Sequence, residues 1–250
     1  PFPPHQKKIP SKNFVVTSRP RHVYYSSMPL HKILQGDAIQ QLNTLPPNSI
    51  NLVLADLPYG TTQNKWDSVL PLTSLWEQLI RVCRPNAAFL FTASQPFTSL
   101  LVSSNLKMFK HEWIWIKNRG SNFANTVREP MKEHESVMVF SQGSWTYNKQ
   151  MQERTGGGAS RVEYEFGHRT ESTNYGEFGG REGQVLPTLR VPSSWQKFNT
   201  EVGFHPTQKP VDLMRYLIRT YSNPNEIILD PTMGSGTTGV AALMENRHFV

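Results

Sequence analysis

Short apolar runs alternate along the chain with segments of helical periodicity. Runs rich in β-branched and aromatic residues predict five strands, at Ile50–Ala55, Ala87–Thr92, Glu112–Ile116, Ser136–Phe140 and Glu226–Asp230. This alternation is typical of a parallel sheet with helices on its faces. The pattern therefore predicts an α/β fold built on a mostly parallel, doubly wound sheet.

Two helices give the clearest periodicity. Over residues 72–83, apolar side chains follow the i, i+3, i+4, i+7 spacing of one buried stripe, which places Trp76 and Cys83 in the core. The second helix begins at Pro210, because the first helical position tolerates a residue without an N–H group. It ends before the Asn-Pro pair at 223–224. Two tryptophans of a predicted strand, at 113 and 115, point to one sheet face and into the core.

The regular pattern stops between residues 143 and 203. Ten of the sixteen glycines lie in this segment, and its composition predicts that no core strand forms there. Its arginines interleave with aromatic side chains, a mixture suited to phosphates, base edges and stacking. Insertions of this length are more often functional or mobile than structural. We expect a recognition insertion at about 143–203, with a plain surface loop as the alternative.

The surplus positive charge gathers at the beginning of the chain. Twenty-six lysines and arginines against 19 aspartates and glutamates give a net charge of +7. Six of the basic residues lie in residues 1–35, which hold no acidic residue. Such an arm favours a polyanionic partner, although a solvated tail has the same composition. The predicted organisation is a basic arm, residues 1–35, followed by one domain, residues 36–250.

Composition excludes several classes of protein. Mean hydropathy is -0.48, and no apolar run approaches the roughly 18 residues that a membrane span needs. The chain begins without an apolar stretch of the signal-peptide kind. Cys83 is the only cysteine, which excludes intrachain disulfides and a cysteine-cluster zinc site. We expect no membrane partner and no metal.

Two segments place polar residues directly after predicted strands. The strand at 50–55 leads into Asp-Leu-Pro-Tyr at 56–59, at the sheet edge where doubly wound folds bind ligands. The strand at 226–230 leads through Asp230 to Gly-Ser-Gly at 234–236, at the start of a helix. Glycines allow close approach of the backbone, and the helix start offers free N–H groups. The second segment predicts a nucleotide-like cofactor, and the absence of a following lysine disfavours phosphate hydrolysis.

Four motifs together resemble those of the β class of DNA amino-methyltransferases. They are GDAIQQL at 36–42, DLPYG at 56–60, HPTQKPVDLMRYLI at 205–218 and DPTMGSGTTGVAA at 230–242. The catalytic motif precedes the cofactor loop, as it does in that class. The resemblance implies a Rossmann-like methyltransferase fold that binds S-adenosyl-L-methionine (AdoMet) and double-stranded DNA.

The resemblance also implies the functional residues. It assigns catalysis to Asp56, Leu57, Pro58 and Tyr59. It assigns cofactor binding to Asp37, Ala38, Asp56, His205, Thr207, Gln208, Lys209, Asp230, Pro231, Thr232, Gly234, Ser235, Gly236, Thr237 and Thr238. The chain departs from the family pattern at Leu57, where a proline is usual, and at Thr232, where a phenylalanine is usual. In this family an acidic residue for the cofactor ribose follows the strand at which the given sequence stops, at Val250, so either a longer chain supplies that acid or ribose recognition differs here.

The residues at 56–59 suit methyl transfer to an amine of a nucleobase. Such an amine is a poor nucleophile because its lone pair is delocalised into the ring. A carboxylate at Asp56 and a backbone carbonyl at Leu57 or Pro58 accept its two N–H bonds and localise the lone pair. Tyr59 offers a π-face to a base that has left the duplex stack. The structural alternatives are a turn cap for Asp56 and a core aromatic for Tyr59.

We expect a site-specific DNA methyltransferase that transfers a methyl group from AdoMet to N6 of a flipped-out adenine. Asp at the head of the catalytic motif is the usual adenine form of the family. The alternatives are a cytosine-N4 methyltransferase and a catalytically silent nucleic-acid-binding subunit. The resemblance further implies a restriction–modification setting, a homodimer as one option, and the cytoplasm of a bacterial, archaeal or phage-infected cell.

Overall fold

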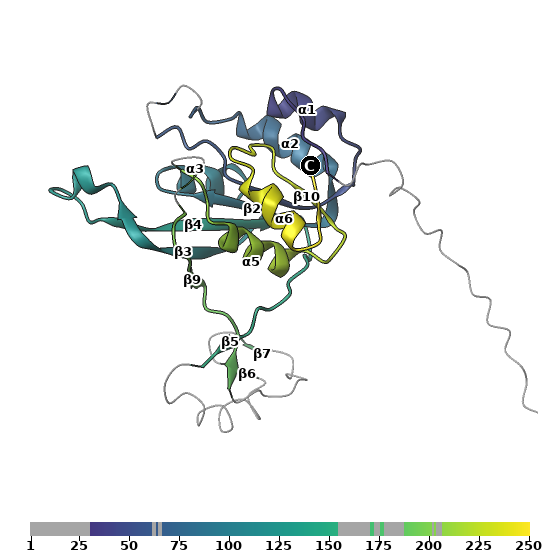
Figure 1. The fold of residues 1–250 in the computed structure, drawn as a ribbon. Helices are drawn as coiled ribbons and strands as arrows, with labels where there is room; N and C mark the ends of the chain where they lie inside the picture. Colours follow the sequence, from purple (N-terminus) through teal and green to yellow (C-terminus); the bar gives the residue numbers. More distant parts are fainter. Residues whose placement is uncertain are drawn as a thin grey trace, which may run out of the picture.

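A twisted seven-stranded sheet forms the centre of the protein (Figure 1). The structure, a computed structural model, describes residues 31–61, 64, 67–154, 171–172, 176–177, 188–201, 203 and 207–250. The strand order is β11-β10-β1-β2-β4-β3-β9. The strands are β1 (Ile50–Ala55), β2 (Cys83–Ala93), β3 (Phe109–Ser121), β4 (Lys132–Ser141), β9 (Trp195–Lys197), β10 (Ile227–Leu229) and β11 (His248–Phe249).

One strand of this sheet runs against the others. β4 pairs antiparallel with both β2 and β3, whereas the remaining neighbours pair in parallel. The prediction of a mostly parallel α/β sheet is therefore confirmed. The predicted strands are present but differ in length, because backbone pairing continues beyond the apolar run in β2, β3 and β4.

Helices cover both faces of the sheet (Figure 1). One face carries α1 (Ala38–Thr44), α2 (Leu72–Val82) and α3 (Phe97–Ser104), and the other carries α5 (Val211–Tyr221) and α6 (Thr237–Met244). β1 is buried throughout because its side chains alternate between the two cores. Val53 packs with α2 on the first face, and Leu54 packs with α5 on the second. The helix α3 has no counterpart among the predicted elements.

The predicted core residues are confirmed. Trp76 lies edge-on against Phe91 and tilted against Phe140, and its indole N–H donates to Ser104 Oγ at 2.8 Å. Cys83 is fully buried beside it in the same core. Trp113 and Trp115 are buried together in the opposite core, as their spacing predicts. The two cores thus clamp the central strands from both sides.

Residues 143–203, in which we expected no core strand, supply a short edge strand to the central sheet, and two of its three residues are exposed. β9 lies in this segment and pairs in parallel with the outer edge of β3, from Ile114↔Trp195 to Ile116↔Lys197. The edge of a sheet presents unpaired N–H and C=O groups, which a short extended segment satisfies whatever its side-chain pattern. At the other end of the segment, Asn148 donates its backbone N–H to Thr220 O at 2.7 Å.

Smaller elements extend from this body. The β3–β4 hairpin projects from the sheet and carries the short helix η1 (Phe123–Asn125) at its tip (Figure 1). Two-stranded ladders join β5 (Gln152–Glu153) to β8 (Leu189–Arg190), and β6 (Glu171–Ser172) to β7 (Gly176–Glu177). About half of the predicted insertion, and residues 1–30 of the predicted arm, lie outside the described residues.

The described end of the arm contacts the sheet. Lys32 donates its backbone N–H to Phe249 O at 2.9 Å, and His31 forms a parallel bridge to the same residue. Residues 31–35, which the sequence assigns to the arm, therefore lie against β11. Among the described residues, no helix is both long and apolar enough to cross a membrane.

Close packing of α6 on β11 gives a test of this architecture. A Cβ added at Gly239 would lie 2.8 Å from Phe249 Cε1, inside van der Waals contact. We expect Gly239→Val to lower the free energy of unfolding by about 1–3 kcal/mol through overpacking, as measured by urea denaturation. Val240→Ala, at the half-exposed neighbouring position, is the control and should change stability by less than about 0.5 kcal/mol. Equal stability of the two variants would contradict the packing described.

Candidate active site

A cavity of about 1040 Å³ lies at the carboxyl ends of β1 and β10. These strands are neighbours, but the chain leaves β1 toward α2 on one face and leaves β10 toward α6 on the other. Doubly wound sheets bind ligands at such a switch point. Most of the predicted site residues line this cavity: Ala38, Asp56, Leu57, Pro58, Tyr59, Thr207, Gln208, Lys209, Asp230, Pro231, Thr232, Gly234, Ser235, Thr237 and Thr238.

Three predicted residues do not lie in the described wall. The Asp37 carboxylate caps α1 by accepting the Gln40 N–H at 3.0 Å, so it positions Ala38 rather than facing the cavity. Gly236 is the N-cap of α6 and lies behind the wall. His205 lies outside the described residues.

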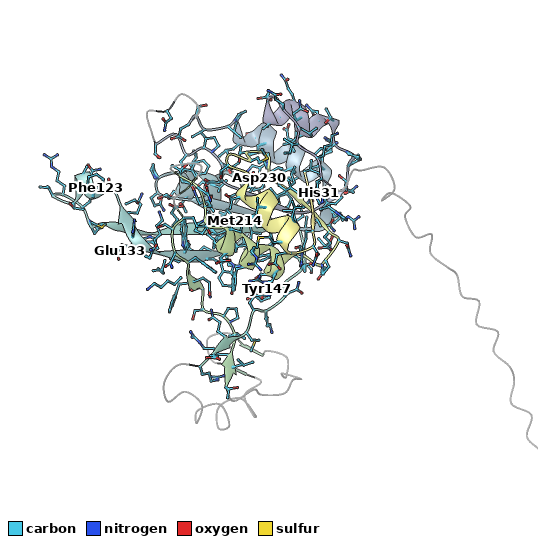
Figure 2. All side chains as sticks on the ribbon, viewed as in Figure 1. His31, Phe123, Glu133, Tyr147, Met214 and Asp230 are labelled. Atoms are coloured by element: carbon cyan, nitrogen blue, oxygen red, sulfur yellow. The ribbon has the colours of Figure 1, made fainter. Side chains whose placement is uncertain are left out.

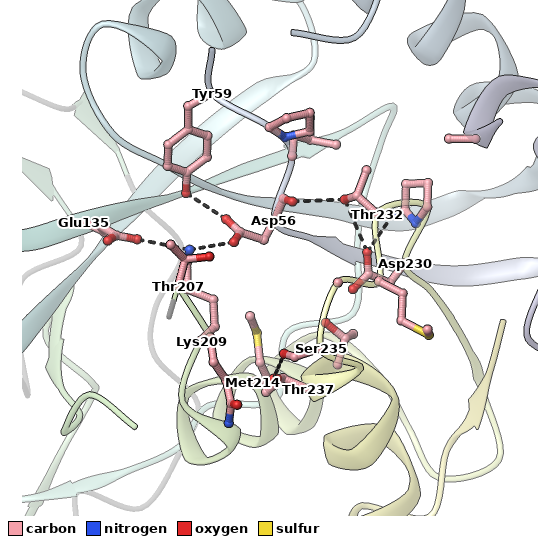
Figure 3. Close-up of a pocket in the computed structure, with 18 of the residues that line it drawn as sticks. Asp56, Tyr59, Glu135, Thr207, Lys209, Met214, Asp230, Thr232, Ser235 and Thr237 are labelled. Atoms are coloured by element: carbon pink, nitrogen blue, oxygen red, sulfur yellow. Dashed lines mark hydrogen bonds and ion pairs between the residues drawn. The ribbon is translucent and has the colours of Figure 1, made fainter. Parts of the chain in front are cut away.

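Asp56 is the centre of a hydrogen-bonded cluster that faces the cavity (Figure 3). Its Oδ1 accepts the Tyr59 hydroxyl at 2.8 Å and the Thr92 hydroxyl in a shorter contact. Its Oδ2 forms an ion pair with Lys209 Nζ at 2.6 Å. Asp56 keeps about a third of its side chain exposed, so the carboxylate is fixed in orientation but still reachable.

Tyr59 is held on two sides. Its ring stacks on Phe97 with the centroids 5.2 Å apart and the planes 19° from parallel. Burial, followed by the nearby charges of Asp56 and Glu135, raises the pKa of the phenol well above its ordinary value. The hydroxyl therefore stays protonated and donates to Asp56, a role that sequence reasoning did not assign to it.

Lys209 is the buried cation of the site. Its ammonium contacts Asp56 at 2.6 Å and Glu135 Oε2 at 3.5 Å, and it lies 5.6 Å from the centre of the Tyr59 ring. Burial lowers the pKa of this lysine, but the two carboxylates outweigh it and raise the pKa above its ordinary value. Lys209 therefore stays charged.

Thr92, Glu135 and Lys117 also belong to this cluster, and sequence reasoning did not select Thr92 or Glu135. Thr92 is near the end of β2, beside Asp56, and its position after an apolar run was the available signal. Glu135 belongs to β4, and its other oxygen pairs with Lys117. Because β4 is reversed, a residue near its beginning reaches the edge where the parallel strands end. A search of strand ends alone misses it.

The cluster around Asp56 forms the first wall of the cavity, and the loop after β10 forms the second wall. Gly234 and Gly236 adopt positive φ angles of 54° and 80°, which favour glycine. No side chain caps the start of α6, so its first N–H groups remain available to a ligand. Thr232 ties this loop to the first wall, because its hydroxyl donates to the backbone carbonyl of Asp56 at 3.0 Å.

The cavity fits the predicted cofactor, AdoMet, which carries an ammonium and a carboxylate at its methionine end. Gln208 Oε1 is buried and has no hydrogen bond among the described residues, so it is an acceptor suited to the ammonium. Its amide nitrogen is fixed by Glu201 at 3.1 Å. The uncapped start of α6 suits the carboxylate. The residues present therefore fit this cofactor.

Asp230 is a buried acid at the root of the glycine loop. It accepts the Thr232 N–H at 3.0 Å. Burial raises the pKa of its carboxyl to about 7, although the hydrogen bonds from Thr238 and Thr232 oppose the shift. The Asp230 carboxyl is thus poorly solvated in the wall of the cavity.

Comparison with known proteins identifies related sequences and folds. A family model described as DNA methylase matches residues 50–250. The chain is 28% identical over 236 residues to DNA adenine methyltransferase YhdJ of Escherichia coli K12, covering 87% of this chain and 76% of that protein. It is 28% identical over 247 residues to type II methyltransferase M1.MboII of Moraxella bovis, covering 88% and 90%.

Solved structures share the fold. The M1.HpyAVI–SAM complex superposes with a TM-score of 0.56 and 23% identity, covering 87% of this chain and 90% of that one. The cytosine-N4-specific PvuII DNA methyltransferase superposes with a TM-score of 0.60 and 15% identity, covering 88% and 82%. These likenesses confirm the predicted Rossmann-like methyltransferase fold.

The raised pKa of Asp230 predicts a pH-dependent stability. The ordinary pKa is 3.8 and the folded value is about 7, so between these values the unfolded chain is ionised while the folded chain holds the proton. Folding stability therefore falls as pH rises through this window. Relative to Asp230→Asn, the parent should lose up to about 4 kcal/mol between pH 4 and pH 7, and nothing further above pH 7.

Chemical denaturation at a series of pH values measures this difference. Asp212→Asn is the control, because that carboxylate is largely exposed on α5. A difference between parent and Asp230→Asn that does not change with pH would show that the acid is not buried as described.

Proposed function

Because the chain belongs to the N6/N4 class of DNA methylases, we propose that it methylates N6 of adenine in duplex DNA with AdoMet as the methyl donor. The arrangement of Asp56 carries the proposal: a reachable carboxylate, fixed by Tyr59, Thr92 and Lys209, shares one cavity with a glycine loop. Two walls so placed bring a methyl donor and an amine together, which is the main requirement of the reaction.

The choice of adenine rests on two observations. Aspartate heads the motif at 56–59, the form usual for adenine in the family. The relative YhdJ is named as an adenine methyltransferase. Cytosine N4 is the second candidate, because the PvuII enzyme of the same fold is cytosine-N4-specific.

The residues of the first wall prepare the target amine. The Asp56 carboxylate accepts one N–H of the amine, and a backbone carbonyl at Leu57 or Pro58 accepts the other. These bonds draw the lone pair out of the ring system. AdoMet, when bound, supplies the methyl group on a sulfonium, which is a good leaving group without help from an acid. The alkylated nitrogen then gives up a proton, and Asp56 is the nearest acceptor.

The residues of the second wall orient the cofactor. The start of α6, Gln208 and Thr207 serve its methionine end, and Asp230 and the Gly234–Ser235 turn serve the rest. The bond from Thr232 to the Asp56 carbonyl holds the two walls at a fixed separation. Small errors in that separation affect methyl transfer strongly, because the reacting atoms must approach within about 3–3.5 Å.

DNA contacts are proposed for the basic arm and the recognition insertion. The charge of residues 1–35 suits phosphate contacts, and the arginine–aromatic composition of residues 143–203 suits base contacts. A homodimer and the boundaries of the arm and the insertion stay predictions.

Methylation of one kind of base tests the proposal directly. The parent protein should transfer methyl groups from labelled AdoMet to duplex DNA, and nucleoside digestion should give N6-methyladenine. Asp56→Asn should lower the rate by at least a thousandfold while keeping its affinity for DNA, because the amide lacks the negative charge that withdraws the amine protons. N4-methylcytosine in the digest supports the second candidate. Equal rates for parent and variant would exclude the assigned role of Asp56.

The glycine loop makes a separate prediction about the cofactor. Gly234 has a φ of 54°, which a β-branched residue rarely adopts. We expect Gly234→Val to distort the loop and to weaken AdoMet binding at least tenfold in calorimetry. Gly143→Val, at a glycine with ordinary φ outside the cavity, is the control and should bind AdoMet as the parent does. An unchanged affinity in Gly234→Val would place the cofactor elsewhere.

A further inference from the structure

The Lys209 ammonium stands where the target amine is expected. It donates a hydrogen bond to Asp56 Oδ2 at 2.6 Å and lies over the Tyr59 ring, 5.6 Å from its centre. The target base is proposed to make the same two contacts: its amine bonds to Asp56 and its ring lies beside Tyr59. We propose that Lys209 is a placeholder, which occupies the position of the target amine until the base enters, and that Glu135 then receives its ammonium. This inference rests on the proposed function.

The Asp56 carboxylate has few free lone pairs to accept hydrogen bonds from both Lys209 and the target amine. Its Oδ1 already accepts two hydroxyl groups, from Tyr59 and Thr92. A carboxylate oxygen has two lone pairs, so the target amine must bind Oδ2, where Lys209 is the donor. The base therefore displaces Lys209 or shares its acceptor oxygen.

Sharing the acceptor would oppose the reaction. The amine nitrogen becomes positively charged as its bond to the methyl carbon forms. An ammonium held on the same carboxylate repels that charge and neutralises the anion that should stabilise it. Movement of Lys209 from Asp56 toward Glu135 weakens this repulsion and leaves only the two hydroxyls hydrogen-bonded to Asp56. The displacement thus favours the transition state over the resting site.

Glu135 is placed to receive the displaced ammonium. Its side chain is largely buried in the cavity wall, and its Oε1 is committed to Lys117. Its Oε2 is buried without a hydrogen bond among the described residues and faces Lys209 Nζ at 3.5 Å. A shift of about 0.7 Å brings Nζ to an ordinary charged hydrogen-bond distance of about 2.8 Å. A lysine side chain makes such a shift by small rotations of its stem.

The charges of the cluster balance before and after this exchange. Asp56 and Glu135 carry two negative charges, and Lys117 and Lys209 carry two positive charges. When Lys209 moves, both ammonium groups gather on Glu135 and the negative charge of Asp56 is left for the amine. Glu135 acts through Lys209, so it is a positioning residue.

The isosteric variant Glu135→Gln tests the exchange, because it keeps the shape of the side chain and removes the receiving charge. Under single-turnover conditions with saturating AdoMet and DNA, we expect methyl transfer at least tenfold slower than in the parent. AdoMet affinity should stay within twofold. Glu133→Gln is the matched control: it is exposed on the same strand, outside the cavity and on the projecting hairpin (Figure 2), and should react at the parental rate.

A double-mutant cycle separates this role from a structural one. In a Lys209→Met background there is no ammonium to move, so adding Glu135→Gln should slow transfer by less than threefold. A merely structural Glu135 predicts the same penalty in both backgrounds, and that result would overturn the inference. Lys209→Gln replaces Lys209→Met in the cycle if the latter does not fold, and if neither folds, a parental single-turnover rate in Glu135→Gln overturns the inference.

The activity of the parent protein separates a failure of the proposed function from a failure of the placeholder role. A folded parent that binds DNA but transfers no methyl group contradicts the proposed function. An active parent whose Glu135→Gln variant reacts at the same rate contradicts the placeholder role alone.

Discussion

Parallel pairing of β1 with β10 is the constraint from which the site follows. The register aligns Val53 with Leu229, so both strands end at one edge and deliver Asp56 and Asp230 side by side. The hydrogen bond from Thr232 to the Asp56 carbonyl, across 176 residues of sequence, then locks the two loops together. Because the chain turns to opposite faces after these strands, a cavity opens between the loops. Both walls of the cavity are therefore products of one strand pairing.

The parts of the fold that depend on local pattern were predictable from sequence. β1, α2 and α5 follow from apolar periodicity, and Asp56 and Asp230 follow from their places after apolar strands. Elements that depend on a partner were not. β9 forms because β3 offers it an open edge, and neither Trp195 nor its neighbours carry a strand pattern. Glu135 enters the site because β4 is reversed, and the direction of a strand is a property of the whole sheet.

The two walls of the cavity differ in how their buried charges are compensated. The wall around Asp56 carries two carboxylates and two ammonium groups, so its buried charges are compensated by direct ion pairs. The wall formed by the glycine loop carries Asp230, which has hydrogen bonds but no ion pair with any described residue, and burial raises the pKa of its carboxyl. The charges of the first wall are therefore held by partners, whereas burial makes the charge of Asp230 costly.

The order of strands in the sheet has a consequence for biosynthesis. β1 is made early, whereas β10 and β11 are made almost 180 residues later. β10 then pairs with the open side of β1, and β11 pairs with β10. Until then the ribosome-bound chain holds a largely apolar strand with one unpaired edge, a feature that favours pairing with other chains. Completion of the catalytic site and removal of this aggregation hazard are thus the same late folding event.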